Sequence, residues 1–294
     1  MDNARRIRSL LFAPGSDPKK LSGVFRYGAD AVDLDLEDSV STNEKVAARG
    51  LVAAVLARPP DPGGPLVVVR LNGPTTGLAE ADLEAVLQPS VFALHITKID
   101  DVESIQRLDR LASKLEAERR MPVGGVRLIC SIDSAHLVLR LPELARSTPR
   151  LYCFIIGGYD YANDIGVAVS KEMTESLWAR SYGVLVSRDA GLAPPLHPPS
   201  AKLEDPGHWT AIAASAKALG FQGVIAIHPK QLSAIAAVFA PTDDEVAWAR
   251  QVVDDFAEAE RRGTAAIRVR GELVDYAMVK RAEQILRSGG DLTG

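Results

Sequence analysis

Short apolar runs alternate with amphipathic stretches along most of the chain. The runs are rich in valine, isoleucine and leucine, which is typical of strands buried on both faces. The stretches between them, such as 101–120 and 208–220, carry apolar residues at helical spacing. The predicted strands cover residues 8–14, 31–36, 66–71, 92–98, 126–132, 151–156, 192–196 and 223–227.

Eight strands that alternate with helices favour a closed (β/α)₈ barrel, or TIM barrel, over an open sheet. The seventh run, "LAPPL" at 192–196, is the weakest because its prolines cannot donate hydrogen bonds to a neighbouring strand. We therefore expect an α/β protein with a barrel over residues 1–240.

The chain continues too far beyond the last predicted strand for a single closing helix. Residues 241–263 read as a helix that begins with Thr242 and Glu245 in capping-box spacing, and a further segment follows at 265–286. We expect residues 241–294 to form a C-terminal helical extension that contributes to the barrel mouth, either of its own subunit or of a neighbouring one.

The composition, 47% hydrophobic and 24% charged, is that of a globular protein with a large core. A net charge of −4 argues against a nucleic-acid partner. Cys130 and Cys153 lie in apolar runs and read as core residues of a protein from a reducing compartment. Without an apolar run of about 20 residues or a signal peptide, we expect no membrane partner and a cytoplasmic location.

Residues just past the predicted strands carry the candidate chemistry, because TIM-barrel active sites form at the carboxyl ends of the strands. A set of acids beside one arginine, one lysine and one histidine favours a hard divalent cation with an arginine that binds a carboxylate. The residues at these positions are Glu37, Asp38, Arg70, Asn72, Lys98, Asp133, Asp160 and His228.

Asp133 and Asp160 are the predicted metal ligands, because they follow two successive strands. Mg²⁺ typically takes one or two carboxylates, with substrate and water as the remaining ligands. Gly157 and Gly158 supply backbone that a ligand can approach closely. The alternative, which spacing alone favours, makes Asp133 a turn residue and Asp160 a helix cap.

The basic candidates also have structural alternatives. Taken alone, Arg70 could equally pair with an internal acid or bind a substrate. Lys98 could be a surface residue. Lys45 and Arg49 share a helix face by spacing, as a solvated basic patch or as ligands of phosphates. His228 precedes a proline and fits a structural role in a turn.

Read together, the motifs resemble the citrate lyase beta-subunit-like (CitE-like) branch of the HpcH/HpaI aldolase and citrate lyase family. Its members are divalent-metal (β/α)₈ enzymes that act on acyl-CoA or related thioesters. The matching segments follow the family order over nearly the whole chain, and they are "RSLLFAPGSDPKKL", "GADAVDLDLEDSV", "NEKVAARG", "VVRLN", "ITKIDDVES", "GGYDYANDIG", "LGFQGVIAIHPKQ", "VFAPTDDEVAWAR" and "GELVDYAMVKRA".

The resemblance implies that Arg70 binds the 2-oxo acid and stabilises the developing enolate, and that Asp133 and Asp160 bind Mg²⁺, with Mn²⁺ as an alternative ion. Glu37, a further catalytic candidate, would lie with Asp38 around the metal and its waters.

The resemblance further implies that Asp35 meets a buried basic partner, and that Asp275 enters the active site of a neighbouring subunit. A homo-oligomer, a trimer or hexamer, is therefore expected. Arg8, Lys45 and Arg49 would lie near the thioester or the CoA phosphates.

Two departures from the family pattern stand out. Asp133 occupies a position where the family usually has glutamate, so the carboxylate is one methylene shorter. After strand seven, where many relatives have an Asp-Gly pair, this chain reads "LHPPS" with His197. Both departures lie at the rim of the expected site.

These observations predict an Mg²⁺-dependent carbon–carbon lyase that cleaves, or forms, a 3-hydroxyacyl-CoA of the malyl-CoA or citramalyl-CoA type, with an acyl-CoA and a 2-oxo acid as products. The alternatives are a catalytically silent relative that binds a CoA ester or acts as a scaffold, and a CoA-independent 2-oxo-acid aldolase. Replacing Arg70 by alanine is expected to abolish turnover and leave folding intact.

Overall fold

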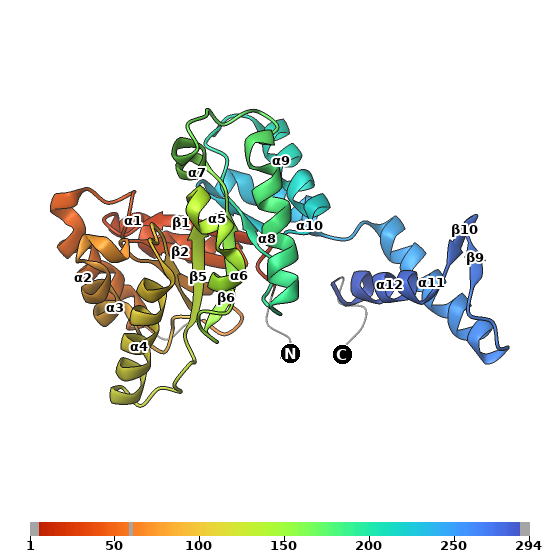
Figure 1. Cartoon of the computed structure of the whole chain (residues 1–294), viewed down its shortest axis with the longest axis horizontal. Coiled ribbons are helices and arrows are strands. Elements are labelled where there is room, and N and C mark those ends of the chain that lie inside the picture. Colours follow the sequence, from red (N-terminus) through yellow and green to blue (C-terminus); the bar gives the residue numbers. More distant parts are fainter. Residues whose placement is uncertain (1–5, 59–60, 289–294) are drawn as a thin grey trace. The chain divides into compact units, whose positions relative to one another are not determined.

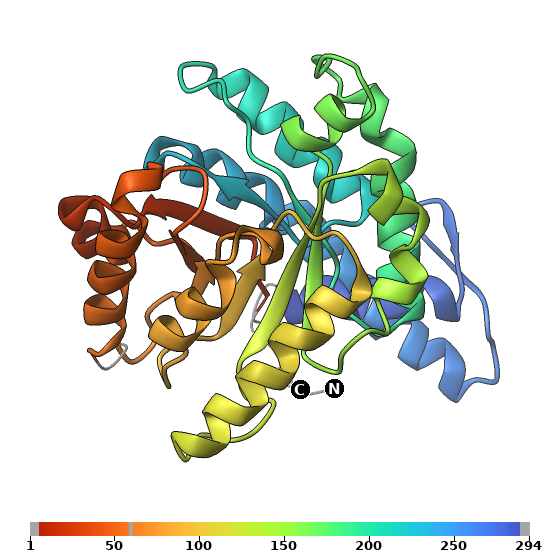
Figure 2. The ribbon, with the colours of Figure 1, turned by 60° about the vertical axis from the view of Figure 1, so that its left-hand side comes forward.

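The computed structural model describes residues 6–58 and 61–288 (Figure 1). Eight parallel strands close into a barrel, in which each strand pairs with its neighbours in chain order and β8 pairs with β1 (Figure 2). The strands are β1 Ser9–Pro14, β2 Ala31–Asp35, β3 Leu66–Arg70, β4 Ala93–Ile96, β5 Arg127–Ile132, β6 Leu151–Ile156, β7 Leu196–His197 and β8 Gly223–Ala226.

Helices connect successive strands and surround the barrel, as the alternation of patterns predicts. The α-helices of this part are α1 Pro18–Gly23, α2 Lys45–Leu56, α3 Ala79–Val86, α4 Val102–Glu118, α5 Ala135–Leu139, α6 Leu141–Leu144, α7 Tyr159–Asp164, α8 Leu177–Asp189, α9 Pro206–Leu219 and α10 Leu232–Phe239. Short 3₁₀ helices are η1 Val24–Arg26, η2 Thr42–Glu44, η3 Pro74–Thr76, η4 Thr174–Ser176 and η5 Pro229–Gln231.

The predicted TIM barrel is therefore confirmed, and each predicted strand overlaps an observed one. The seventh strand is indeed the shortest, since β7 contains only Leu196 and His197. The prolines before it leave few N–H groups for pairing, so β7 contacts β6 through the single register pair Ile155–Leu196.

The barrel interior is a packed apolar core at its lower levels and polar at the level of the mouth. The lower core contains Leu10, Val68, Ile129 and Ile225, each from a different strand. Cys130 and Cys153 are buried, free thiols, as predicted, and burial raises the pKa of Cys130 to about 12. These thiols are structural rather than reactive.

A buried ion cluster fixes α4 to the start of β6. Arg150 is buried and donates from Nη1 to Glu116 Oε1 at 2.9 Å, while its Nε donates to Asp109. Glu116 also accepts hydrogen bonds from the N–H groups of Gly124 and Val126. Burial alone would raise the pKa of Glu116, but these bonds and the charge of Arg150 hold it below its ordinary value of 4.5.

This lowered pKa predicts a pH-dependent effect of Glu116→Gln. The charged form stabilises the fold above pH 4.5, and this contribution is lost as the pH falls through the folded-state pKa. We expect Glu116→Gln to lower the free energy of unfolding at pH 7 by about 1–3 kcal/mol, with a smaller difference from wild type at acid pH. Urea unfolding across pH 3.5–8 measures this. An equal difference at every pH would contradict the assignment.

Among the described residues, those up to Ala236 form one compact unit, and those from Ala237 onward form a second. The second unit contains α11 Asp243–Arg261 and α12 Tyr276–Ser288, and the predicted capping box of Thr242 and Glu245 is present at the start of α11. Its own core joins both helices through residues such as Val252, Phe256 and Ala282.

The predicted helical extension omits a hairpin that the structure contains. Strands β9 Ile267–Val269 and β10 Glu272–Val274 pair antiparallel across a two-residue turn of Arg270 and Gly271. Both turn residues have positive φ, 48° and 88°, which is typical of the tight turns that join such strands. The alternating "IRVRGELV" pattern is the signal that this prediction overlooked.

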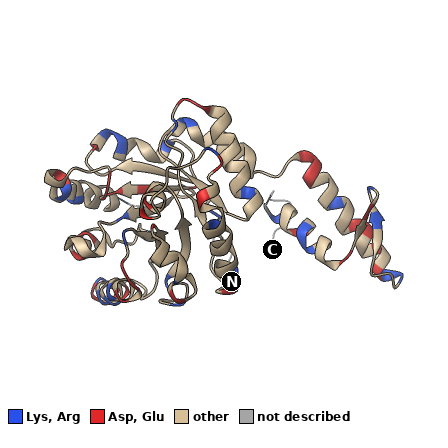
Figure 3. Ribbon diagram, turned by 45° about the horizontal axis from the view of Figure 1, so that its top comes forward, with Lys and Arg blue, Asp and Glu red and all other residues tan. Residues whose placement is uncertain are grey.

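Lysine and arginine residues are interspersed with acidic ones on the helices that surround the barrel (Figure 3). This arrangement agrees with the small net charge of −4. No helix among the described residues is long and apolar enough to cross a membrane.

Candidate functional site

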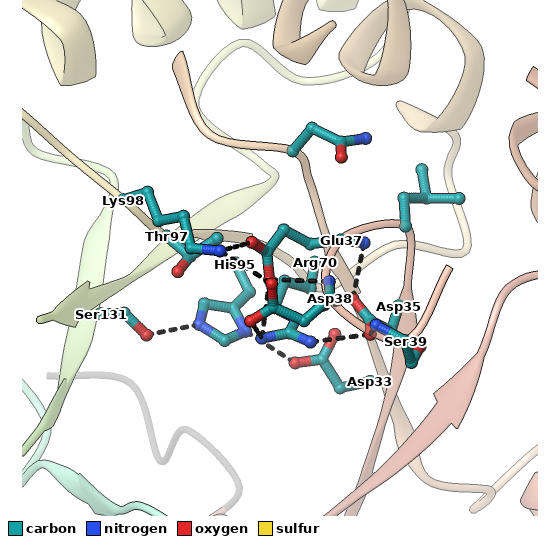
Figure 4. A network of polar contacts seen from close by, with 12 residues as sticks. Asp33, Asp35, Glu37, Asp38, Ser39, Arg70, His95, Thr97, Lys98 and Ser131 are labelled. Carbon is teal, nitrogen blue, oxygen red and sulfur yellow. Dashed lines mark hydrogen bonds and ion pairs between the residues drawn. The ribbon is translucent and has the colours of Figure 1, made fainter. Parts of the chain in front are cut away.

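The acidic run that begins in β2 supplies the centre of a polar network at the barrel mouth (Figure 4). Asp33 and Asp35 alternate with apolar residues along β2, so both side chains point into the barrel, one level apart. Both are fully buried. Because an unpaired buried carboxylate is expensive, each needs a partner from a neighbouring strand.

Arg70, the last residue of β3, is the partner of Asp35. Its Nε and Nη2 both donate to the Asp35 carboxylate at 2.7 Å, in a bidentate pair across the registered strands. The guanidinium also lies over the Phe12 ring, 5.0 Å from its centroid. Arg70 is therefore the buried basic partner that we expected for Asp35, and Asp35 is the internal acid that we considered as a partner of Arg70.

The charge of Arg70 controls the titration of this pair. Burial alone would raise the pKa of Asp35, but the hydrogen bonds and charge of Arg70 outweigh burial and hold that pKa below its ordinary value. The pair therefore remains ionised at neutral pH, and the guanidinium is held in one orientation at the mouth.

Glu37 and Asp38 lie above this pair and face two cationic side chains. Arg70 Nη1 lies 3.1 Å from Glu37 Oε2, and Lys98 Nζ contacts both Glu37 and Asp38, the latter at 2.7 Å. The charge opposite these acids within the described chain is thus ammonium and guanidinium. Burial raises the pKa of Glu37, despite the opposing charge of Arg70.

Lys98 occupies a strained backbone position that brings its side chain over the mouth. Its φ is +50°, which is uncommon for residues other than glycine. The sequence alternatives for Lys98 included a surface role, and nothing in its local sequence indicated the contact with Glu37. The only usable signal was its place directly after β4.

Replacing Lys98 by methionine should raise the pKa of Glu37 further, because the hydrogen bond from Lys98 lowers it. We expect the acid limb of any pH–rate profile to move to higher pH and activity at neutral pH to fall several-fold. Activity measured from pH 5 to 9 tests this, with the exposed Lys217→Met as control. An unchanged acid limb would show that Lys98 does not set the charge of Glu37.

A second buried pair lies one level below Arg70. His95 Nδ1 donates to Asp33 Oδ2 at 2.8 Å, and His95 Nε2 lies 2.9 Å from Ser131 Oγ. Asp33, from β2, thus reaches β4 and β5 through one imidazole (Figure 4). Neither His95 nor Ser131 was a predicted site residue, although His95 alternates with apolar residues in a predicted strand and so faces the interior.

Asp133 and Asp160, the predicted metal ligands, follow β5 and β6. Asp133 Oδ2 accepts hydrogen bonds from Thr97 Oγ1 at 3.1 Å and from the N–H of Lys98 at 3.3 Å. Asp160 lies in the first turn of α7, and Asp164, one turn later on this helix, accepts a hydrogen bond from the N–H of Ala135. This contact ties the loop after β5 to α7.

The two carboxylates lie close enough to repel each other. Burial raises the pKa of Asp133, and the charge of Asp160 raises it further. No lysine or arginine within residues 6–58 and 61–288 forms an ion pair with either aspartate. A cation between them would remove this repulsion.

This donor set fits Mg²⁺ better than a metal that needs several protein ligands. In the described part of the chain, no three histidine, cysteine, aspartate or glutamate side chains converge as a metal site. Two carboxylates with open positions suit Mg²⁺, whose other ligands are commonly water and substrate oxygens, whereas structural zinc sites need four protein ligands.

Gly157 and Gly158 form the turn between β6 and α7, as predicted from their place after the strand. Both have positive φ, 92° and 104°, and a Cβ on Gly158 would lie 3.3 Å from Pro198. These positions therefore require glycine for the turn that carries Asp160. Their predicted contact with a substrate stays a prediction.

The three cations predicted to bind CoA are Arg8, Lys45 and Arg49, and each of them has a partner within the protein. Arg8 precedes β1, at the opposite end of the barrel, where it pairs with Asp30 at 2.9 Å. Arg49 pairs with the buried Asp82 at 2.8 Å. Lys45 donates to the carbonyl oxygens of Leu36 and Glu37. Arg8 is therefore not retained in the candidate site, since its side chain cannot reach the carboxyl ends of the strands.

Asp275 and His228 both cap helices. Asp275, in the second unit, accepts hydrogen bonds from the N–H groups of Ala277 and Met278 at the start of α12. His228 caps η5, as its predicted structural role requires.

Comparison with protein families gives a match over residues 8–229 to HpcH/HpaI aldolase/citrate lyase. A citrate lyase subunit beta from Leuconostoc mesenteroides subsp. cremoris is 30% identical, with 98% of this chain and 94% of the relative covered. A mitochondrial citramalyl-CoA lyase from Rattus norvegicus is also 30% identical, with 95% and 85% covered.

Among solved structures, the chain is similar to protein CitE from Mycobacterium tuberculosis in complex with magnesium, acetoacetate and coenzyme A. The TM-score is 0.77 and the identity 25%, with 97% of this chain and 98% of that chain covered. The resemblance inferred from the sequence motifs is thereby confirmed.

Proposed function

Because the chain belongs to the HpcH/HpaI aldolase/citrate lyase family and is a lyase, we propose that it is an Mg²⁺-dependent CoA-ester lyase. It would cleave a 3-hydroxyacyl-CoA of the malyl-CoA or citramalyl-CoA type into an acyl-CoA and a 2-oxo acid, or catalyse the reverse reaction. Support comes from the named activities of its relatives and from the magnesium, acetoacetate and coenzyme A bound by the solved CitE.

The single observation that carries this proposal is that Lys98 joins two parts of the mouth: its N–H donates to Asp133, and its Nζ contacts Glu37, which pairs with Arg70. Burial and the charge of Asp160 raise the pKa of Asp133, so a cation at this carboxylate would be favoured. When bound, Mg²⁺ would polarise the 2-oxo group as a Lewis acid.

Arg70 would bind the developing enolate. Nε and Nη2 of Arg70 donate to Asp35, and Nη1 lies 3.1 Å from Glu37 Oε2. Each Nη carries two N–H groups, so one on each would remain to bind a substrate. The bidentate pair with Asp35 holds these donors in place before substrate binds, and such preorganisation is the main source of electrostatic catalysis. Glu37, whose pKa is raised by burial, would hold Arg70 from the other side and could hold a proton at low pH.

The proton at the reacting carbon requires an acid or base, for which we propose Asp275 of a neighbouring subunit. In this account the chain forms a homo-oligomer, a trimer or hexamer. Asp275→Asn would then abolish turnover but leave Mg²⁺ affinity unchanged, whereas replacing a metal ligand would lower that affinity.

The shorter Asp133 is compatible with metal binding in this proposal. Thr97 and the N–H of Lys98 both donate to Oδ2, so the carboxylate is oriented and Oδ1 remains for an ion. A water molecule between Oδ1 and the ion would compensate for the missing methylene.

Turnover assays test the proposed function directly. Purified protein with Mg²⁺ and a panel of malyl-, citramalyl- and related CoA thioesters should release a 2-oxo acid, detected by a coupled dehydrogenase. EDTA should abolish the reaction, and added Mg²⁺ or Mn²⁺ should restore it. Absence of turnover across the panel, with calorimetric binding of CoA esters indifferent to Mg²⁺, would instead support a catalytically silent binding protein or scaffold.

A CoA-independent 2-oxo-acid aldolase is the second candidate. The observation that favours it is that Lys45 and Arg49, the remaining predicted CoA-binding cations, are engaged by protein groups. Cleavage of free 4-hydroxy-2-oxo acids at a rate above that of any thioester would identify this activity.

A further inference from the structure

Arg180 is a fully buried arginine without an acidic partner. It lies on α8 with 1% of its surface exposed. Its Nη2 donates to the carbonyl oxygen of Met173 at 2.9 Å, and its Nη1 lies 3.1 Å from His197 Nε2. Its Nε has no hydrogen-bond partner, and no carboxylate of the described chain lies within ion-pair distance of it. Other buried arginines, Arg70 and Arg150, are paired with carboxylates.

His197 does not neutralise this charge. His197 Nδ1 donates to the carbonyl oxygen of Pro198 at 2.8 Å, so its Nε2 accepts the hydrogen bond from Arg180. Burial lowers the pKa of His197 to about 4, and the imidazole is therefore neutral. The buried guanidinium therefore meets a neutral imidazole here.

Glu175, the acid whose charge acts on Arg180, already has other partners. Glu175 accepts hydrogen bonds from the N–H and Oγ of Ser170, and it acts on Arg180 only through longer-range attraction. A buried cation without a paired anion is expensive, and no carboxylate of the described residues forms an ion pair with Arg180. An anion bound next to the Arg180 guanidinium would therefore stabilise the fold.

A cavity of about 420 Å³ adjoins Arg180 between α8 and α9, referred to below as the Arg180 cavity. Lys171, His197 and His208 also line it. Two acids, Glu172 and Asp205, line it as well, but Asp205 accepts a hydrogen bond from the N–H of His208 and caps α9. The volume suits a small organic anion rather than a single water molecule.

A second, smaller cavity lies beside the Arg180 cavity. It has a volume of about 120 Å³ and shares Lys171, Met173 and His208 with the first. Its wall continues to Gly158, in the turn after β6, and to Ser200, after β7.

We propose that the Arg180 cavity binds a small oxyanion, a carboxylate or a phosphate, that supplies the counter-charge of Arg180. The planar guanidinium matches both groups in geometry, and Lys171 adds a second cation at the rim. A carboxylate would belong to an organic acid, whereas a phosphate could bind as the free ion. This site is separate from Arg70, Asp133 and Asp160, and it does not depend on the proposed lyase activity.

Calorimetry and thermal unfolding of the full-length protein test the proposal at constant ionic strength, with sodium chloride as balance. The probes are inorganic phosphate, acetate and succinate. Wild type should bind at least one of them saturably and show a rise in melting temperature of about 3 °C at tenfold excess over the dissociation constant. Preference for phosphate or for the carboxylates identifies the source of the oxyanion.

Two variants and a control separate this site from non-specific binding. His197→Glu places a carboxylate within reach of Arg180, so it should raise the melting temperature without ligand and weaken anion binding at least tenfold. Arg180→Met should also lose binding, with its fold checked by circular dichroism. Arg188→Met, an exposed arginine on the same helix, should bind like wild type. Unchanged anion binding in His197→Glu, or no saturable binding of any probe by wild type, would overturn the proposal.

Discussion

Replacing Arg70 by alanine is expected to abolish measurable turnover and to lower the free energy of unfolding by about 3–5 kcal/mol. The stability effect follows from the fully buried Asp35, which would keep its charge and lose both hydrogen bonds from Arg70. From the sequence alone we expected this change to leave folding intact, because that expectation did not take the ion pair of Arg70 with Asp35 into account. Urea unfolding together with the turnover assay measures both effects.

Arg70→Lys is the matched variant for this prediction. A lysine keeps the positive charge beside Asp35 but cannot donate the bidentate pair or hold further N–H groups toward a substrate. It should recover most of the lost stability and little of the activity. Full activity in Arg70→Lys would contradict an orienting role of the guanidinium, and wild-type stability in Arg70→Ala would contradict the importance of its pair with Asp35.

Replacing Asp133 by asparagine should have opposite effects on stability with and without metal. Burial raises the pKa of Asp133 in the fold, so its charged form destabilises the metal-free protein above its unfolded pKa, near 3.8. We therefore expect metal-free Asp133→Asn to melt at a higher temperature than wild type at pH 7. Mg²⁺ affinity should fall about 100-fold or more, because replacing a residue that only hydrogen-bonds to a metal ligand already lowers metal affinity about 10–100-fold.

Differential scanning calorimetry with EDTA and with Mg²⁺ measures both effects of this change. Asp133→Glu restores the longer carboxylate of the family and should bind Mg²⁺ at least as tightly as wild type. Asp189→Asn, at an exposed position on α8, serves as the control. Equal Mg²⁺ affinity in wild type and Asp133→Asn would remove Asp133 from the site.

The barrel could be predicted because each strand carries its signal locally. Apolar runs and helical spacing identify β1 to β6 and β8, and even the weakness of β7 follows from its prolines. The hairpin of β9 and β10 was overlooked because its strands are three residues long, too short for a periodic pattern to exceed that of the flanking helices.

The site could be predicted only in part, since side-chain pairing between strands depends on register. The position of Asp35 and Arg70 at the ends of neighbouring strands made their pairing foreseeable. The link from Asp33 through His95 to Ser131 joins residues up to 98 positions apart across three strands, and no local pattern encodes it. Arg8 was assigned by motif, although its place before β1 puts it at the other end of the barrel.

The account depends most on one magnesium ion held by Asp133 and Asp160 beside Arg70. A crystal structure of the protein soaked with Mg²⁺ and pyruvate tests it most directly. We predict an octahedral ion about 2.0–2.1 Å from one oxygen of each ligating aspartate, or bridged to Asp133 by water, with two pyruvate oxygens and water molecules as the other ligands, next to Arg70. An ion bound elsewhere, or pyruvate bound without any ion between these carboxylates, would contradict it.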